Sequence, residues 1–201
     1  LAITYPEIYE MQVEAIITAA IAAHREGVKV LPEIEMPIVA HVNEMKVLRE
    51  LTERVIEPYR PQIHFSYKIG AMLELPRACL TADRLSDYSD FFSFGTNDLT
   101  QTTYGISRDD VGKFMNTYIE RGILERDPSE SIDLDGVGEL MRIGVRLARR
   151  AKPDIDIGIC GEHGGDPASI EFCHSLGLNY VSCSPYRVVA ARVAAGRAAI
   201  Q

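Results

Sequence analysis

The sequence alternates between strand-like and helix-like patterns along its whole length. Short apolar runs are each followed by a stretch whose apolar residues recur at helical spacing. Because parallel strands need a crossover between them, this alternation predicts an α/β fold with a parallel sheet. The predicted strands are residues 33–39, 67–74, 91–94, 155–161 and 179–183. The predicted helices are residues 6–27, 41–57, 76–85, 109–122, 133–152 and the stretch from 185 onward.

Five strand–helix units are too few to close an eight-stranded barrel, but they fit most of one. A five-stranded doubly wound sheet is the competing architecture. Such a sheet usually carries a glycine-rich phosphate loop after its first strand, and nothing similar follows Val39. We therefore expect a partial (β/α)8 barrel of the TIM type.

Composition narrows the functional classes. The 201 residues carry a net charge of −8, which argues against a surface that binds nucleic acid. No apolar run approaches the length of a membrane span, and there is no signal-peptide pattern. The four cysteines lack the spacing of a disulfide framework, so we expect a reducing compartment and not secretion. The chain begins at Leu1 without a methionine, which we interpret as the tail of a longer protein.

Three predicted strands end in residues that can carry chemistry. Glu74, Asp98 and Cys160 each lie at the carboxyl end of a different strand, where α/β proteins place their sites. Two carboxylates without a histidine to join them suit a hard cation such as Mg²⁺ or Mn²⁺ better than zinc. A general acid–base dyad, or two unrelated surface acids, would give the same pattern.

Cys160 allows several interpretations. Its spacing to His163 resembles half of a zinc site, but no second pair stands at ligand spacing. A thiol beside a glycine-rich loop could instead donate a proton or act as a nucleophile, or be a small buried apolar group. Cys183 closes the next strand and is a rival candidate.

Four segments carry a resemblance that covers essentially the whole chain. They read MLELPRA from Met72, FFSFGTNDLTQ from Phe91, GICGEHGGDP from Gly158 and NYVSCSP from Asn179. Together they resemble the carboxyl-terminal part of the pyruvate, phosphate dikinase family, which includes phosphoenolpyruvate synthase and enzyme I of the sugar phosphotransferase system. GEHGGDP and SCSP are more similar to the dikinases than to the other two branches.

The resemblance implies a role for particular residues. By position, Glu74 and Asp98 match the Mg²⁺ ligands of the family, and Cys160 matches its proton donor. The substrate-binding set would comprise Glu74, Gly95, Thr96, Asn97, Asp98 and Arg108, of which Arg108 matches an arginine of the enzyme I branch. The domain implied for residues 1–201 is the carboxyl-terminal portion of the barrel that binds phosphoenolpyruvate (PEP) or pyruvate, about its last five strand–helix units.

The function implied is reversible phosphoryl transfer that forms PEP from pyruvate, ATP and phosphate through an Mg²⁺-stabilised enolate. The implied partners are the substrate, the phosphohistidine domain of the parent chain and a second copy in a homodimer, in the cytoplasm or an organelle. Two arginines of earlier barrel strands that grip the phosphoryl group are absent here, so we expect these residues alone to be inactive. The alternatives are a PEP synthase or enzyme I relative, a small Mg²⁺-dependent enolate lyase, and a non-catalytic dimerisation module.

Overall fold

The computed structural model describes residues 1–200, except for the side chain of Arg108. The strands are β1 (Glu33–Met36), β2 (Lys68–Leu73), β3 (Phe91–Gly95), β4 (Asp156–Cys160) and β5 (Tyr180–Val181). The α-helices are α1 (Pro6–Arg25), α2 (Val42–Ile56), α3 (Pro76–Leu80), α4 (Ala82–Leu85), α5 (Thr96–Tyr104), α6 (Arg108–Val111), α7 (Met115–Glu120), α8 (Val137–Ala151), α9 (Pro167–Ser175) and α10 (Val188–Ala198). Short 3-10 helices are η1 (Glu57–Gln62), η2 (Ser86–Tyr88), η3 (Glu162–Gly165) and η4 (Pro185–Arg187).

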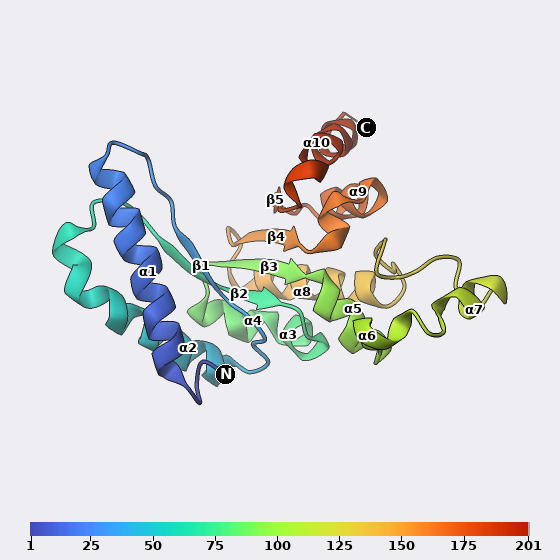
Figure 1. The fold of residues 1–201 in the computed structure, drawn as a ribbon, viewed down its shortest axis with the longest axis horizontal. Helices are drawn as coiled ribbons and strands as arrows, with labels where there is room; N and C mark the ends of the chain where they lie inside the picture. The colour runs from blue at the N-terminus through green and yellow to red at the C-terminus, as the bar shows by residue number, and fades with distance from the viewer. Residues whose placement is uncertain (201) are drawn as a thin grey trace.

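The five strands form one open parallel sheet, which confirms the predicted α/β class (Figure 1). Their order in the sheet, β1-β2-β3-β4-β5, is their order in the chain. Because every strand runs in the same direction, all carboxyl ends reach the same edge. Helices α5, α6 and α7 lie beyond that edge, on the right of Figure 1. Among residues 1–200, no helix combines the length and apolarity needed to span a bilayer.

The two faces of the sheet differ in chemistry because side chains alternate along each strand. One face is apolar and fully buried in the main core, and consists of Ile34, Met36, Ile69, Ala71, Leu73, Phe92, Phe94, Ile157 and Ile159. Helix α8 packs on this face, where the absence of a side chain on Gly144 leaves room for the ring of Phe94. The opposite face carries polar groups, among them Glu35, Ser93 and Cys160. Cys160 is the last residue of β4 and lies at the carboxyl edge of the sheet.

Several predicted boundaries are wrong in the first half of the chain. The first strand ends at Met36 and not at Val39, because Pro37 follows it and cannot donate to the ladder. The single helix predicted over residues 76–85 is two, α3 and α4, since the backbone of Thr81 leaves helical geometry (φ −130°, ψ 25°). Helix α5 begins at Thr96, directly after β3, in a stretch for which no helix was predicted.

The second half of the chain also departs from the prediction. The single helix predicted over residues 109–122 is two short ones, α6 and α7. Helix α8 begins at Val137 and not at Asp133, because the Asp133 carboxylate accepts hydrogen bonds from the backbone N–H groups of Gly136 and Val137. A side chain that bonds to the backbone in this way marks the start of a helix and does not continue it.

Gly164 lets the turn after β4 pack directly against the chain that follows β5. A Cβ atom at this position would lie 2.2 Å from the carbonyl oxygen of Ser182, a backbone atom that cannot rotate away. We expect Gly164→Ala to lower the free energy of unfolding by about 1–3 kcal/mol through overpacking. The control is Gly196→Ala in α10, where nothing lies within 4 Å and alanine should stabilise the helix by about 0.5–1 kcal/mol. Urea unfolding of both variants would measure the difference, and equal effects would contradict the predicted close approach.

Candidate functional site at the carboxyl edge of the sheet

The structure brings the predicted strand-end residues to one edge of the sheet. Glu74 directly follows β2, Gly95 ends β3 and Cys160 ends β4. Gly95 and Cys160 are partners in the parallel register. Asp98 is not at a strand end but in the first turn of α5, which begins at Thr96. Asp98 was predicted at the end of a strand and lies instead in the helix that follows it. Its carboxylate is still close to Glu74, at the same edge of the sheet.

Glu74 and Asp98 form a close acid pair. Glu74 is 3% exposed, and its carboxyl shares a side-chain hydrogen bond with that of Asp98. Burial, together with the nearby Asp98 charge, raises the pKa of Glu74 to about 7, although the N–H of Ile38 donates to its Oε1 over 2.5 Å and opposes the rise. Two carboxyls this close cannot both be ionised cheaply unless a cation lies between them. The pair therefore suits a divalent cation.

The glycine at the end of β3 makes this arrangement possible. A Cβ atom on Gly95 would lie 2.6 Å from Oε2 of Glu74 and 2.6 Å from the sulfur of Met72. The carboxylate of Glu74 thus lies over the backbone of the neighbouring strand. Any larger residue at position 95 would displace it, which explains in physical terms why the motif contains glycine here.

Thr96 and Asn97 are held by the turn that follows β4. The Thr96 hydroxyl lies 3.0 Å from the carbonyl oxygen of Cys160, and Oδ1 of Asn97 accepts from the N–H of Glu162 over 3.1 Å. Gly161, at φ +102°, approaches both side chains so closely that a Cβ would stand 3.0 Å from each. Because Oδ1 of Asn97 is engaged as an acceptor, its NH₂ group is the donor end of that side chain.

The Cys160 thiol lies among polar groups, 3.5 Å from the carbonyl oxygen of Phe94. Burial raises its pKa above the usual value, a hydrogen bond with Ser93 opposes the rise, and the charges of Glu35, Glu74 and Asp98 add to it. The thiol is therefore protonated at neutral pH, a state suited to proton donation and not to attack as a thiolate. Cys183 lies elsewhere, against the small apolar cluster of α9 and α10 formed by Ile170, Ala191 and Ala194.

Glu35 is a site-facing acid that the sequence analysis missed. It lies on β1, its Oε1 is buried without a hydrogen-bond partner within the described chain, and burial followed by the charges of Glu74 and Glu33 raises its pKa to about 7. Ile38 was missed for a different reason. It adopts a left-handed φ of 53°, rare for a branched residue, and acts through its backbone N–H, which no side-chain pattern reveals.

The raised pKa of Glu35 predicts a pH-dependent stability. A carboxyl whose folded pKa lies above its unfolded value of 4.5 contributes stability below pH 4.5, which is lost as pH rises through about 7. Glu35→Gln removes that loss. We expect the free energy of unfolding of the variant, relative to that of the parent, to rise by roughly 1–2 kcal/mol from pH 5 to pH 8. This value is reduced because solvent reaches part of the side chain. Urea unfolding at both pH values without divalent cations would measure it, and a pH-independent difference would contradict it.

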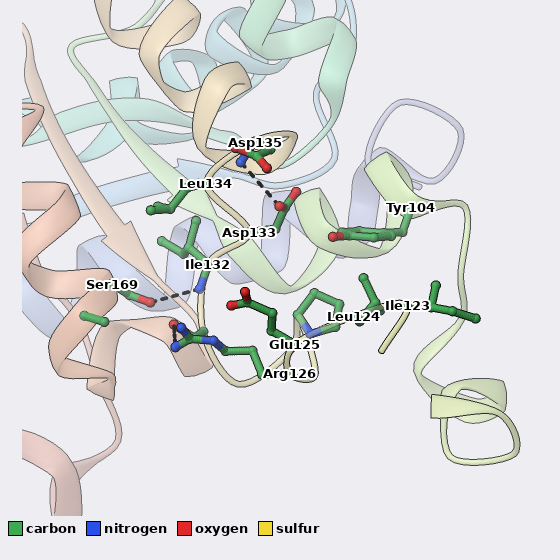
Figure 2. A pocket seen from close by; sticks show the side chains of 13 residues that line it. Tyr104, Ile123, Leu124, Glu125, Arg126, Ile132, Asp133, Leu134, Asp135 and Ser169 are labelled. Carbon is green, nitrogen blue, oxygen red and sulfur yellow. Dashed lines mark hydrogen bonds between the residues drawn. The ribbon is translucent and has the colours of Figure 1, made fainter. Parts of the chain in front are cut away.

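Arg108 was the remaining predicted site residue, and its side chain lies outside the described residues. A separate pocket of about 460 Å³ lies near this end of the molecule (Figure 2). Its wall is made by Tyr104 of α5, by Ala168 and Ser169 of α9, and by the segment that precedes α8. Figure 2 shows the backbone of that segment bonded to α9, with Ile132 N–H donating to the Ser169 hydroxyl over 3.0 Å.

A parallel α/β sheet with an acid pair and a protonated thiol at its carboxyl edge fits a domain that binds a small anionic substrate through a cation. Comparison with known families identifies the class. The model of the family described as PEP-utilising enzyme, PEP-binding domain, matches residues 1–200. The chain belongs to this family.

Curated proteins similar to this chain include several pyruvate, phosphate dikinases. The chain is 54% identical over 203 residues to the enzyme of Rhizobium meliloti (strain 1021), which covers 100% of this chain and 23% of the relative. It is 50% identical to the enzyme of Clostridium symbiosum, with the same coverage. It is 53% identical to pyruvate, phosphate dikinase 2 of Oryza sativa subsp. japonica, over 98% of this chain and 22% of the relative. The chain thus spans less than a quarter of the length of these proteins.

Proposed function

We propose that residues 1–201 are the carboxyl-terminal portion of the PEP/pyruvate-binding domain of a pyruvate, phosphate dikinase. The identity of about half of all positions along the whole chain supports this proposal. In this account the open sheet is part of a (β/α)8 barrel, about its last five strand–helix units. The sequential strand order and the all-parallel pairing are those of a barrel wall.

The observation that carries the proposal is the Glu74–Asp98 acid pair beside the Cys160 thiol. Their crowding, which raises the pKa of Glu74, is relieved if both are ionised around one Mg²⁺. Mg²⁺ takes one or two protein carboxylates and leaves its other positions for water and substrate oxygens, so the donor set fits. When bound, the ion would supply positive charge to the oxygen of pyruvate that becomes negative during enolisation.

The residues of this chain would perform the remaining work. Gly95, Thr96 and Asn97 form the start of α5, where backbone N–H groups and the NH₂ of Asn97 can bind the substrate carboxylate or phosphate. The Sγ of Cys160 would deliver its proton to the methylene carbon of enolpyruvate, or receive the methyl proton of pyruvate in the opposite direction. Its raised pKa keeps that proton in place between turnovers.

The proposal includes partners that a dikinase needs. The phosphoryl group would come from a phosphohistidine domain elsewhere in the parent chain, and the enzyme would work as a homodimer in the cytoplasm or an organelle. Nucleic acid and membrane are not among the proposed partners, in keeping with the net charge of −8.

The test is the overall reaction of the protein that carries this chain. With pyruvate, ATP, phosphate and Mg²⁺, we expect formation of PEP, AMP and pyrophosphate. PEP formation without pyrophosphate would indicate a PEP synthase instead. Loss of pyruvate methyl protons to solvent without PEP would favour an enolate lyase, and neither activity would favour a non-catalytic module.

A further inference from the structure

His163 joins the candidate site to a segment far from it in sequence. The side chain is fully buried and lies in η3, three residues after Cys160. Its Nδ1 lies 2.8 Å from the Thr96 hydroxyl, and its Nε2 lies 2.8 Å from the carbonyl oxygen of Pro128. From the sequence alone, His163 was a candidate for half of an incomplete zinc site. Its contacts with Thr96 and Pro128 indicate a different role.

The number of available protons decides which ring nitrogen of His163 carries the proton. Three contacts form one chain: Pro128 carbonyl to Nε2, Nδ1 to the Thr96 hydroxyl, and that hydroxyl to the Cys160 carbonyl at 3.0 Å. A neutral imidazole and one hydroxyl supply only two protons for these three contacts. The Pro128 carbonyl can only accept, so the ring must carry its proton on Nε2. Nδ1 then has no proton, so the hydroxyl hydrogen of Thr96 supplies the contact with Nδ1 and is shared with the Cys160 carbonyl.

Electrostatics agrees with an uncharged ring. Burial lowers the pKa of His163 and outweighs the Pro128 hydrogen bond and the charges of Asp166, Glu162 and Asp127, which raise it. No ion pair joins His163 to any of these carboxylates within the described chain.

The segment on the far side of the ring is anchored by the same stretch of sequence. Besides the Pro128 contact, the Ser131 hydroxyl donates to Asp166 over 2.9 Å. Ile132 N–H donates to the Ser169 hydroxyl, as Figure 2 shows. Residues 128–132 are thus held by His163, Asp166 and Ser169, which lie in η3 and at the start of α9. If only anchorage were needed, Asp166 and Ser169 would still provide it without His163. Of these three anchoring residues, His163 is the one that also contacts Thr96.

We propose that His163 is a positioning residue for the substrate-binding start of α5. The hydrogen bond to the Pro128 carbonyl keeps the ring proton on Nε2, so Nδ1 accepts a hydrogen bond from the Thr96 hydroxyl. This bond fixes the position of Thr96, which lies between Gly95 and Asn97. This inference rests on the proposed function for its kinetic consequences, but the protonation of the ring does not depend on it. His163 does not touch the reacting atoms. It acts on them through Thr96.

Two isosteric variants separate this role from simple core packing. The side-chain amide of His163→Asn occupies the position of Nδ1, so it keeps a partner for Thr96 and loses Pro128. The longer His163→Gln reaches the position of Nε2, so it keeps Pro128 and loses Thr96. We expect the Gln variant to raise the KM for pyruvate about tenfold and the Asn variant to change it less than about threefold, because misplacement of a binding group is costly. If both variants raise KM equally, in proportion to their loss of folding stability, the positioning role is wrong.

A second readout needs no activity. Nitrogen-15 NMR of the intact protein with labelled histidines should show a neutral ring with its proton on Nε2 at pH 7, assigned by the signal that His163→Asn removes. A ring protonated on Nδ1, or a charged ring at that pH, would overturn the inference. If the parent protein fails to enolise pyruvate, the proposed function is wrong. The NMR result still tests which nitrogen of His163 carries the proton.

Discussion

Replacing Cys160 with alanine should abolish exchange of the pyruvate methyl protons with solvent, a loss of at least about 10³-fold. The thiol of Cys160 is protonated and lies beside the acid pair, and alanine at this position removes it as the proton donor. Phosphorylation of the protein by ATP and phosphate should stay at the parent level, because that step does not involve the methyl carbon. Deuterium uptake by NMR would measure the first effect, and radioactive labelling the second.

The matched control for this prediction is Cys183→Ala. Cys183 packs against the cluster of α9 and α10, so its loss should cost about 1 kcal/mol of stability and leave the exchange rate unchanged. If Cys183→Ala abolishes exchange and Cys160→Ala does not, the assignment of the proton donor is wrong.

Glu74→Gln should weaken Mg²⁺ or Mn²⁺ binding and lower turnover by about 10²–10³-fold, since an amide oxygen carries no charge to offset the cation. The variant should fold at least as stably as the parent. Glutamine keeps an acceptor for the Ile38 N–H and removes the repulsion by Asp98 that raises the pKa of Glu74. Titration with Mn²⁺, followed by electron paramagnetic resonance, would measure the affinity.

Glu139→Gln is the control, because it makes the same change on the exposed surface of α8. Glu139 forms a solvent-exposed pair with Arg142, so neither Mn²⁺ affinity nor turnover should change. Loss of affinity in both variants would point to a general effect of negative charge and not to a defined ligand.

The sheet was predictable because its strands carry a local pattern. In Phe91–Gly95 every residue is buried, as the apolar run followed by glycine indicated. The acids after the strands were predictable for the same reason, since parallel strands bring their carboxyl ends together whatever lies between them. The hydrophobic pattern also located α1, α2 and α8 to within a few residues.

The remaining features depend on contacts between distant segments. Helices α6 and α7 are short and form part of an irregular excursion, so no long apolar stripe marks their ends. The N–H of Ile38 reaches Glu74 from 36 positions away through a left-handed backbone. His163 bonds to Pro128 and Thr96, which are 35 and 67 positions away. Such roles require the tertiary structure, because the residue types alone fit ordinary core packing.

A crystal of the parent protein soaked with Mn²⁺ and pyruvate would test the central claim most directly. The account predicts one anomalous peak between the carboxylates of Glu74 and Asp98, about 2.0–2.2 Å from an oxygen of each, as expected for such a cation. It also predicts that the pyruvate methyl group faces the Sγ of Cys160. A peak at another site, or pyruvate bound with Glu74 and Asp98 still hydrogen-bonded to each other and no metal between them, would contradict it.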